Sequence, residues 1–104
     1  MTPVQHVVLL KFKPDVSDEK AASLLADVLG LQQKIPGITV CNGGVYSSPE
    51  GRNEGYTHGF VMTFESAAAR DNYLPHPEHE VVKNELIANL DSVIAFDYEI
   101  NTGQ

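Results

Sequence analysis

The segment Tyr56-Thr57-His58-Gly59-Phe60-Val61-Met62-Thr63-Phe64 contains the clearest pattern in this 104-residue chain. Its even-numbered residues are bulky and mostly apolar, whereas its odd-numbered residues are smaller. An alternation with a period of two is typical of a β-strand that packs one face against a hydrophobic core. We therefore predict a strand over residues 56–64, with His58 on the core-like face beside Phe60.

Three more segments have the β-branched and apolar composition of strands: Val4–Phe12, Ile38–Tyr46 and Ser92–Ile100. The first segment places His6 on the same face as Val8 and Leu10. Two predicted strands therefore each present one histidine among core residues. The segment from Ile38 to Tyr46 contains Gly43-Gly44, a pair that favours a bulge or a bend.

Two helical regions separate these strands. Ser17 is a suitable N-cap, and apolar residues then recur every three or four positions from residue 21 to residue 35, before Pro36. The alanine-rich residues 66–73 favour a short helix whose first residue, a serine, can cap it. An apolar stripe over residues 77–90 predicts a second segment of the same helical region, which begins at a proline.

The predicted order is β-α-β-β-α-β with the second helix broken at prolines, which is the ferredoxin-like arrangement of the α+β class. We predict one domain over residues 1–104, with the helices on one face of the sheet. The strand over residues 92–100 has apolar residues on both faces, so the open face of the sheet also needs a cover. The economical cover is a twofold homodimer in which two sheets pack into an α/β barrel.

The composition restricts the partners. Fourteen acidic residues against seven basic ones give a formal net charge of −7, which repels nucleic acid and anionic membrane surfaces. No apolar stretch approaches the roughly 20 residues of a membrane-spanning helix. The single cysteine, Cys41, suits a reducing compartment and a small buried hydrophobic role. We therefore expect a cytoplasmic protein that binds neither nucleic acid nor membrane.

The stretch Tyr73-Leu74-Pro75-His76-Pro77-Glu78-His79 gathers a phenol, two imidazoles and a carboxylate within seven residues. Each proline disfavours the α region for the residue before it, so Leu74 and His76 are expected to be extended. Pro77 is a good first residue for a helix, which places His79 in the first turn. Acid–base chemistry, if the chain performs any, is expected at this corner.

A metal site is not expected at the same corner. His76 and His79 have the spacing of two ligands on one helical turn, but Pro77 places His76 outside the helix. A catalytic zinc normally takes three protein ligands. The sequence therefore predicts no metal and no other cofactor.

Five short motifs occur in consistent order along nearly the whole chain: His6-Val7-Val8-Leu9-Leu10-Lys11-Phe12-Lys13, Glu54-Gly55-Tyr56-Thr57-His58, Thr63-Phe64-Glu65-Ser66, Tyr73-x-x-His76-Pro77-x-His79 and Phe96-Asp97-Tyr98. Together they resemble the stress-responsive dimeric α/β-barrel domain family, called Dabb. The resemblance implies the same dimeric ferredoxin-like fold that the residue patterns predict.

The resemblance also implies roles for individual residues. A plant polyketide cyclase of this family performs an intramolecular aldol condensation, and its catalytic tyrosine and histidine correspond by motif to Tyr73 and His79. Its other pocket histidines correspond to His6, His58 and His76. The implied activity is that of a cyclase-like lyase on a ketide-like or other carbonyl substrate. The chain departs from the cyclase in residues 67–75 and 81–85, which leaves the substrate open.

A second interpretation belongs to a different class of protein. Many Dabb proteins are known only as stress-associated, very stable proteins, so this chain could be a non-catalytic stable dimer or a small-ligand-binding protein. In that case Tyr73 packs structurally and His79 is solvated, while His6 and His58 are satisfied core histidines. A shared open cavity for these side chains would favour the enzyme.

Overall fold

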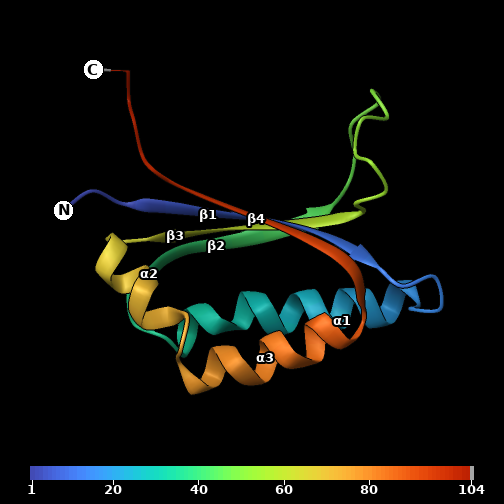
Figure 1. Ribbon diagram of the computed structural model, residues 1–104, viewed down its shortest axis with the longest axis horizontal. Coiled ribbons are helices and arrows are strands. Elements are labelled where there is room, and N and C mark those ends of the chain that lie inside the picture. Colours follow the sequence, from blue (N-terminus) through green and yellow to red (C-terminus); the bar gives the residue numbers. More distant parts are fainter. Residues whose placement is uncertain (104) are drawn as a thin grey trace.

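The computed structural model describes residues 1–103, which form a four-stranded sheet with helices on one face (Figure 1). The elements are β1 (Val4–Phe12), α1 (Asp18–Leu29), a 3-10 turn η1 (Gly30–Gln33), β2 (Ile38–Val45), β3 (His58–Phe64), α2 (Ala67–Tyr73), α3 (Pro77–Ala88) and β4 (Leu90–Glu99). This order confirms the predicted α+β ferredoxin-like fold.

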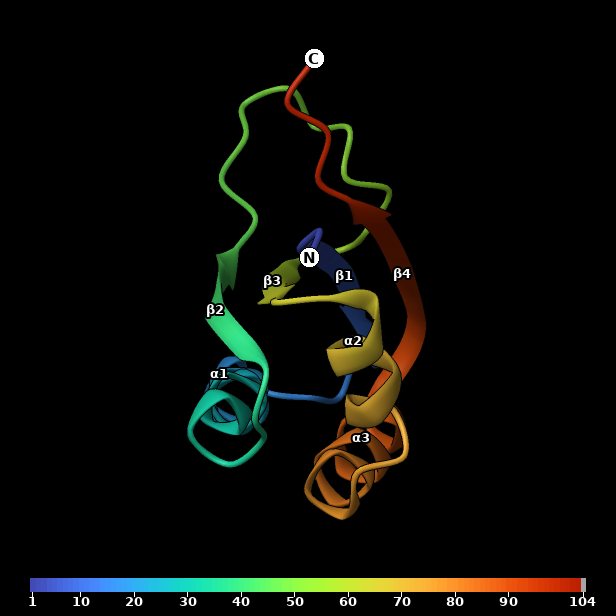
Figure 2. The same cartoon turned by 90° about the vertical axis from the view of Figure 1, so that its left-hand side faces the viewer.

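The sheet is antiparallel throughout and has the strand order β2-β3-β1-β4. Figure 2 shows α1 under the β2 side of the sheet and α3 under the β4 side. The register brings residues from all four strands into one row across the sheet. In order, this row is Cys41, Met62, His6 and Asp97. Two ionisable side chains of β1 and β4 are therefore direct cross-strand neighbours.

The core lies between the sheet and the helices, as the alternation predicts. Leu10, Met62 and Phe64 have no exposed surface. Leu24 and Val28 of α1 pack against the same cluster. The even-numbered residues of β1 and of β3 pair with each other and lie on this helix-facing side of the sheet. The alternation in one strand therefore determines the core-facing residues of both.

The first helix begins as predicted and ends early. The Ser17 side chain accepts a hydrogen bond from the Lys20 amide at 3.0 Å, so the predicted cap is confirmed. The α-helix stops at Leu29, and Gly30 begins the tighter η1 turn. Glycine is a poor helix former, so the prediction of one regular helix up to Ile35 was too long.

The proline corner differs in part from its prediction. Leu74 has φ −56° and ψ −45°, so the prediction that it is extended was wrong. Its amide donates to the Arg70 carbonyl oxygen at 3.2 Å, and this bond continues the helical turn despite the proline that follows. His76 is extended, with φ −63° and ψ 134°, as predicted. Pro77 then begins α3.

Two strands begin at other residues than predicted. β3 begins at His58 rather than Tyr56, and β4 begins at Leu90 rather than Ser92. The only register shift along β2 lies between Ile38 and Val40, so of the predicted bulge or bend at Gly43-Gly44 the bulge is excluded. A Cβ atom at Gly43 would lie 2.6 Å from the Gly59 carbonyl oxygen. Close approach of two backbones therefore explains this glycine.

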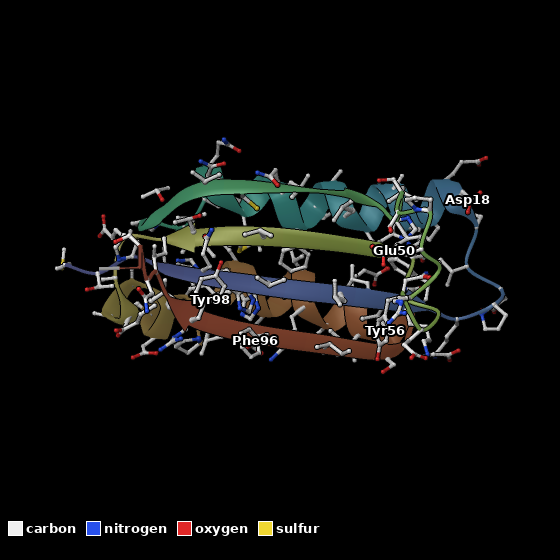
Figure 3. All side chains as sticks on the ribbon, turned by 90° about the horizontal axis from the view of Figure 1, so that it is seen from above. Asp18, Glu50, Tyr56, Phe96 and Tyr98 are labelled. Atoms are coloured by element: carbon white, nitrogen blue, oxygen red, sulfur yellow. The ribbon has the colours of Figure 1, made fainter. Side chains whose placement is uncertain are left out.

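The other face of the sheet has no helix over it (Figure 3). It presents exposed apolar side chains from three strands: Leu9, Val40, Ile94, Phe96 and Tyr98. The loop over residues 46–57 rises beyond this face at one end of the sheet (Figure 1). Within residues 1–103, no helix has the length and apolar character needed to cross a bilayer.

Candidate active site

A cavity of about 180 Å³ lies between α3 and the helix-facing side of β1 and β4. Most of its wall is aliphatic or aromatic, from Val8, Val28, Leu31, Phe60, Val82, Leu86 and Leu90. Four polar side chains reach it: His6, Tyr73, His79 and Lys83. The cavity thus combines an apolar interior with a small polar group, as ligand sites commonly do.

Tyr73 and His79 lie against each other in this cavity. Tyr73 is the last residue of α2 and is 2% exposed, because its ring packs on Phe64 at a centroid distance of 5.0 Å. The rings of Tyr73 and His79 are 4.2 Å apart between centroids and inclined by 36°. Burial is the main cause that raises the pKa of Tyr73 far above its ordinary value, and the negative charge of Asp97 adds to it. The phenol therefore keeps its proton at neutral pH and can donate a hydrogen bond.

His79 has one nitrogen committed to the backbone. Its Nδ1 donates to the Leu74 carbonyl oxygen at 2.9 Å. A carbonyl can only accept, so Nδ1 carries the proton and Nε2 of the neutral ring has a free lone pair. Burial lowers the pKa of His79, and Lys83 lowers it further, against the opposing effects of the Leu74 carbonyl and Glu80. His79 is therefore a neutral base at pH 7.

His6 belongs to a chain of hydrogen-bonded ionisable side chains beside the same cavity. Its Nδ1 lies 2.5 Å from Asp97 Oδ1, and Arg70 Nη1 donates to Asp97 Oδ2 at 2.9 Å. Burial by itself raises the pKa of Asp97, but the hydrogen bonds from His6 and Arg70 outweigh it and lower the pKa below its ordinary value. Asp97 is therefore ionised at neutral pH. The His6 ring, with a side chain 12% exposed, meets Tyr73 edge to face at 6.1 Å.

The structure brings His6, Tyr73 and His79 together but not His58 or His76. His58 pairs with Leu10, four residues along β1 from His6, which separates the two histidines by ~13 Å of strand. Its ring instead packs edge to face on Phe12 at 5.0 Å. The His76 side chain accepts a hydrogen bond from the Glu78 amide at 3.1 Å, so it caps α3.

Asp97, which pairs with His6, and Arg70, which pairs with Asp97, were not among the residues predicted to form the site. Asp97 is an odd-numbered residue of β4, on the face that also carries Val93 and Ala95. The alternation of this strand therefore placed a carboxylate on the helix side, but the pairing of Asp97 with His6 depends on a register between strands that are far apart in sequence. No sequence signal pointed to Arg70.

Residues 1–103 contain no group of three histidine, cysteine, aspartate or glutamate side chains that could hold a metal ion. Cys41 lies in the same sheet row as His6, and burial raises the pKa of its thiol to about 11. A thiol with this pKa is protonated at neutral pH and is a poor nucleophile. The imidazole and phenol groups that reach the cavity are of the types that act in general acid–base catalysis.

The lowered pKa of His79 predicts its titration. In an NMR titration the His79 ring is expected to change charge at a pH below 6.5, because burial disfavours the cation. In the unfolded chain the same ring takes up its proton first, so this group is expected to reduce the stability of the fold as pH falls below about 6.5. A midpoint at or above 6.5 would contradict the burial of the ring.

The chain matches known proteins over almost its whole length. The family model of the Stress responsive A/B Barrel Domain (Dabb) matches residues 4–100. The stress-response A/B barrel domain-containing protein HS1 of Arabidopsis thaliana is 37% identical over 97 residues, covering 93% of this chain and 89% of HS1. Olivetolic acid cyclase of Cannabis sativa is 27% identical over 95 residues, covering 91% of this chain and 94% of the cyclase.

Solved structures have the same fold. Hydroxynitrile lyase from Passiflora edulis superposes with a TM-score of 0.92 at 26% identity, covering 99% of this chain and 97% of the lyase. A dimeric ferredoxin-like protein of unknown function from Jannaschia sp. CCS1 superposes with a TM-score of 0.83 at 28% identity, covering 94% and 99% of the two chains. With the family model matched from β1 to the end of β4, this chain belongs to the stress-responsive A/B barrel domain (Dabb) family.

Proposed function

We propose that this protein is a homodimeric enolising enzyme, a cyclase or lyase, that uses Tyr73 and His79 on a small carbonyl compound. The observation that carries the proposal is the contact of the two rings at 4.2 Å on one mostly apolar cavity. Its likeness to proteins named olivetolic acid cyclase and hydroxynitrile lyase supports a reaction of this class. His6, on the same cavity, is the third member of the site.

The proposed chemistry follows from the protonation states. His79 Nε2 takes a proton from the carbon next to the carbonyl group, and the electron pair of that C–H bond forms an enolate. The Tyr73 hydroxyl donates a hydrogen bond to the developing enolate oxygen. In a cyclase reaction the enolate carbon then bonds to a second carbonyl carbon, and the resulting alkoxide takes the proton back from His79.

The cavity size supports a small reacting part. A cavity of about 150 Å³ with an apolar lining holds a molecule of benzene size, and this cavity measures about 180 Å³. Leu74, Ile87 and Val93 line it and are themselves partly open to solvent. The enclosed part of a substrate is therefore about one ring, and a longer chain leaves the cavity past these three side chains.

Exchange of α-protons in D₂O tests the proposal without knowledge of the natural substrate. NMR is expected to show faster exchange of the methyl protons of acetophenone, or of the α-protons of a β-keto thioester, with the protein than with buffer alone. An enolising site catalyses this step whether or not ring closure follows. Ligand-induced shifts of cavity methyl groups without any exchange would instead favour a non-catalytic small-ligand-binding protein.

The homodimer rests on the open face of the sheet. Phe96 is 63% exposed there, and Leu9, Ile94 and Tyr98 lie beside it. Contiguous apolar surface of this kind is typical of an interface, and the Jannaschia sp. CCS1 protein with this fold is described as dimeric.

The dimer predicts a mass and a variant that changes it. Light scattering at micromolar concentration is expected to give twice the chain mass of 11.4 kDa. Phe96→Glu is expected to give the single-chain mass, because a carboxylate would be buried in the interface without a partner. Glu99→Gln, on the same strand but outside the apolar patch, is the control. A single-chain mass for the unmodified protein would overturn the dimer.

A further inference from the structure

Arg70 lies outside the residues that touch the cavity but is fixed at two points. Its Nε donates to Asp71 Oδ1 at 2.8 Å, and its Nη1 donates to Asp97 Oδ2 at 2.9 Å. The first bond holds the guanidinium against its own helix, and the second reaches across to β4. Because the guanidinium is planar and always charged, these two bonds define its orientation.

The hydrogen bond from Arg70 to Asp97 determines which carboxylate oxygen is available to His6. Arg70 occupies Oδ2, which leaves Oδ1 for His6 Nδ1 at 2.5 Å. An ionised carboxylate can only accept hydrogen bonds, so Nδ1 of His6 must carry the proton. In the neutral form of the ring, the free lone pair is then on Nε2. His79 has the same tautomer, enforced by the Leu74 carbonyl at 2.9 Å.

We infer that Arg70 is a positioning residue that acts through Asp97 to hold His6 in the Nδ1-protonated tautomer, with Nε2 free as a second proton acceptor of the site. The effect of Arg70 on the reaction rate rests on the proposed function. Its effect on the His6 tautomer does not. Arg70 and Tyr73 are three residues apart in α2. One helical turn therefore carries both the guanidinium that bonds to Asp97 and the phenol beside His6.

The alternative is that Arg70 only forms solvent-exposed ion pairs and has no effect on His6. Asp71 has a side chain that is 65% exposed, and its pair with Arg70 fits that description. The Asp97 pair does not, because both of its side chains are about three-quarters covered and its carboxylate also bonds to a cavity histidine. Asp71 therefore provides the matched control.

The test is ¹⁵N NMR of the histidine side chains in Arg70→Met and Asp71→Asn, compared with the unmodified protein. In the unmodified protein and in Asp71→Asn, His6 is expected to show a protonated Nδ1 and an unprotonated Nε2. In Arg70→Met the Asp97 carboxylate can rotate, so the two His6 signals are expected to move towards each other as tautomers mix. Arg70→Lys, which keeps a charged donor to Asp97, is expected to restore the original pattern.

A second readout links the tautomer to rate. Arg70→Met is expected to lower kcat for α-proton exchange roughly tenfold with little change in KM, because a misaligned acid–base group affects the transition state rather than binding. If Arg70→Met does not fold, Arg70→Leu, which also lacks a hydrogen-bond donor, carries the same comparison. Unchanged His6 signals in the Arg70 variant, or equal changes in Asp71→Asn, would overturn the inference. A lack of exchange in the unmodified protein would overturn the proposed function alone, since the NMR result stands without it.

Discussion

His79→Ala is expected to lower the rate of α-proton exchange by about 10²–10⁴-fold, the range that a positioned general base contributes. The methyl group that remains cannot accept a proton, and the Tyr73 hydroxyl has no lone pair of comparable basicity. The His79 ring is only half-buried and makes one bond, to the Leu74 carbonyl. The mass of the protein and its melting temperature are therefore expected to change little.

His76→Ala is the matched control for this variant, three residues earlier in the chain. Its ring caps α3 through the Glu78 amide and does not line the cavity. Loss of a helix N-cap costs about 0.5–2 kcal/mol of stability, so His76→Ala is expected to melt earlier while keeping its exchange rate. Equal losses of rate in both variants would mean that the corner acts structurally, and a stable but fully active His79→Ala would remove His79 from the mechanism.

Phe64→Ala is expected to reduce the free energy of unfolding by about 3–5 kcal/mol, the usual cost of truncating a buried phenylalanine. Phe64 has no exposed surface and supports the Tyr73 ring at 5.0 Å. Chemical denaturation measures the loss, which is expected to be similar at all protein concentrations. A loss below about 1 kcal/mol would show that the core collapses around the missing ring.

Phe96→Ala provides the comparison on the opposite face of the same sheet. Because Phe96 is exposed in one protomer, its truncation is expected to destabilise the assembly and not the protomer. Its effect on the free energy of unfolding is therefore expected to shrink as the protein is diluted below the dissociation constant of the dimer, whereas the effect of Phe64→Ala does not. The pair of variants separates the core face of the sheet from the proposed interface face.

The fold was predictable because each local pattern agreed with the others. The alternation around Phe60 identifies the core face of β3, and Ser17 and Ser66 both cap helices where the sequence placed them. One error occurs where a local preference lost to hydrogen bonding. Leu74 stays helical before a proline because its amide bonds to the Arg70 carbonyl, and no propensity rule includes that bond.

The site was only partly predictable. Tyr73 and His79 are near in sequence, so a motif could join them. Asp97 and His6 are separated by 91 positions and meet only through the register of β1 and β4. His58 shows the limit of the alternation, since it shares a face with His6 but lies four residues along the strand. A face can be inferred from alternation, whereas a position along it depends on pairing.

β4 carries a residue of the proposed dimer interface and the carboxylate partner of His6 at consecutive positions. Phe96 points to the open face and Asp97 to the helix-facing side, and β4 is an edge strand paired only with β1. One peptide unit thus connects the surface on which we propose a second subunit docks to the carboxylate that orients His6. A contact that restrains β4 on the open face of the sheet therefore also limits the backbone motion of Asp97 on the other face. The quaternary state of the protein and the orientation of His6 are coupled through this one strand.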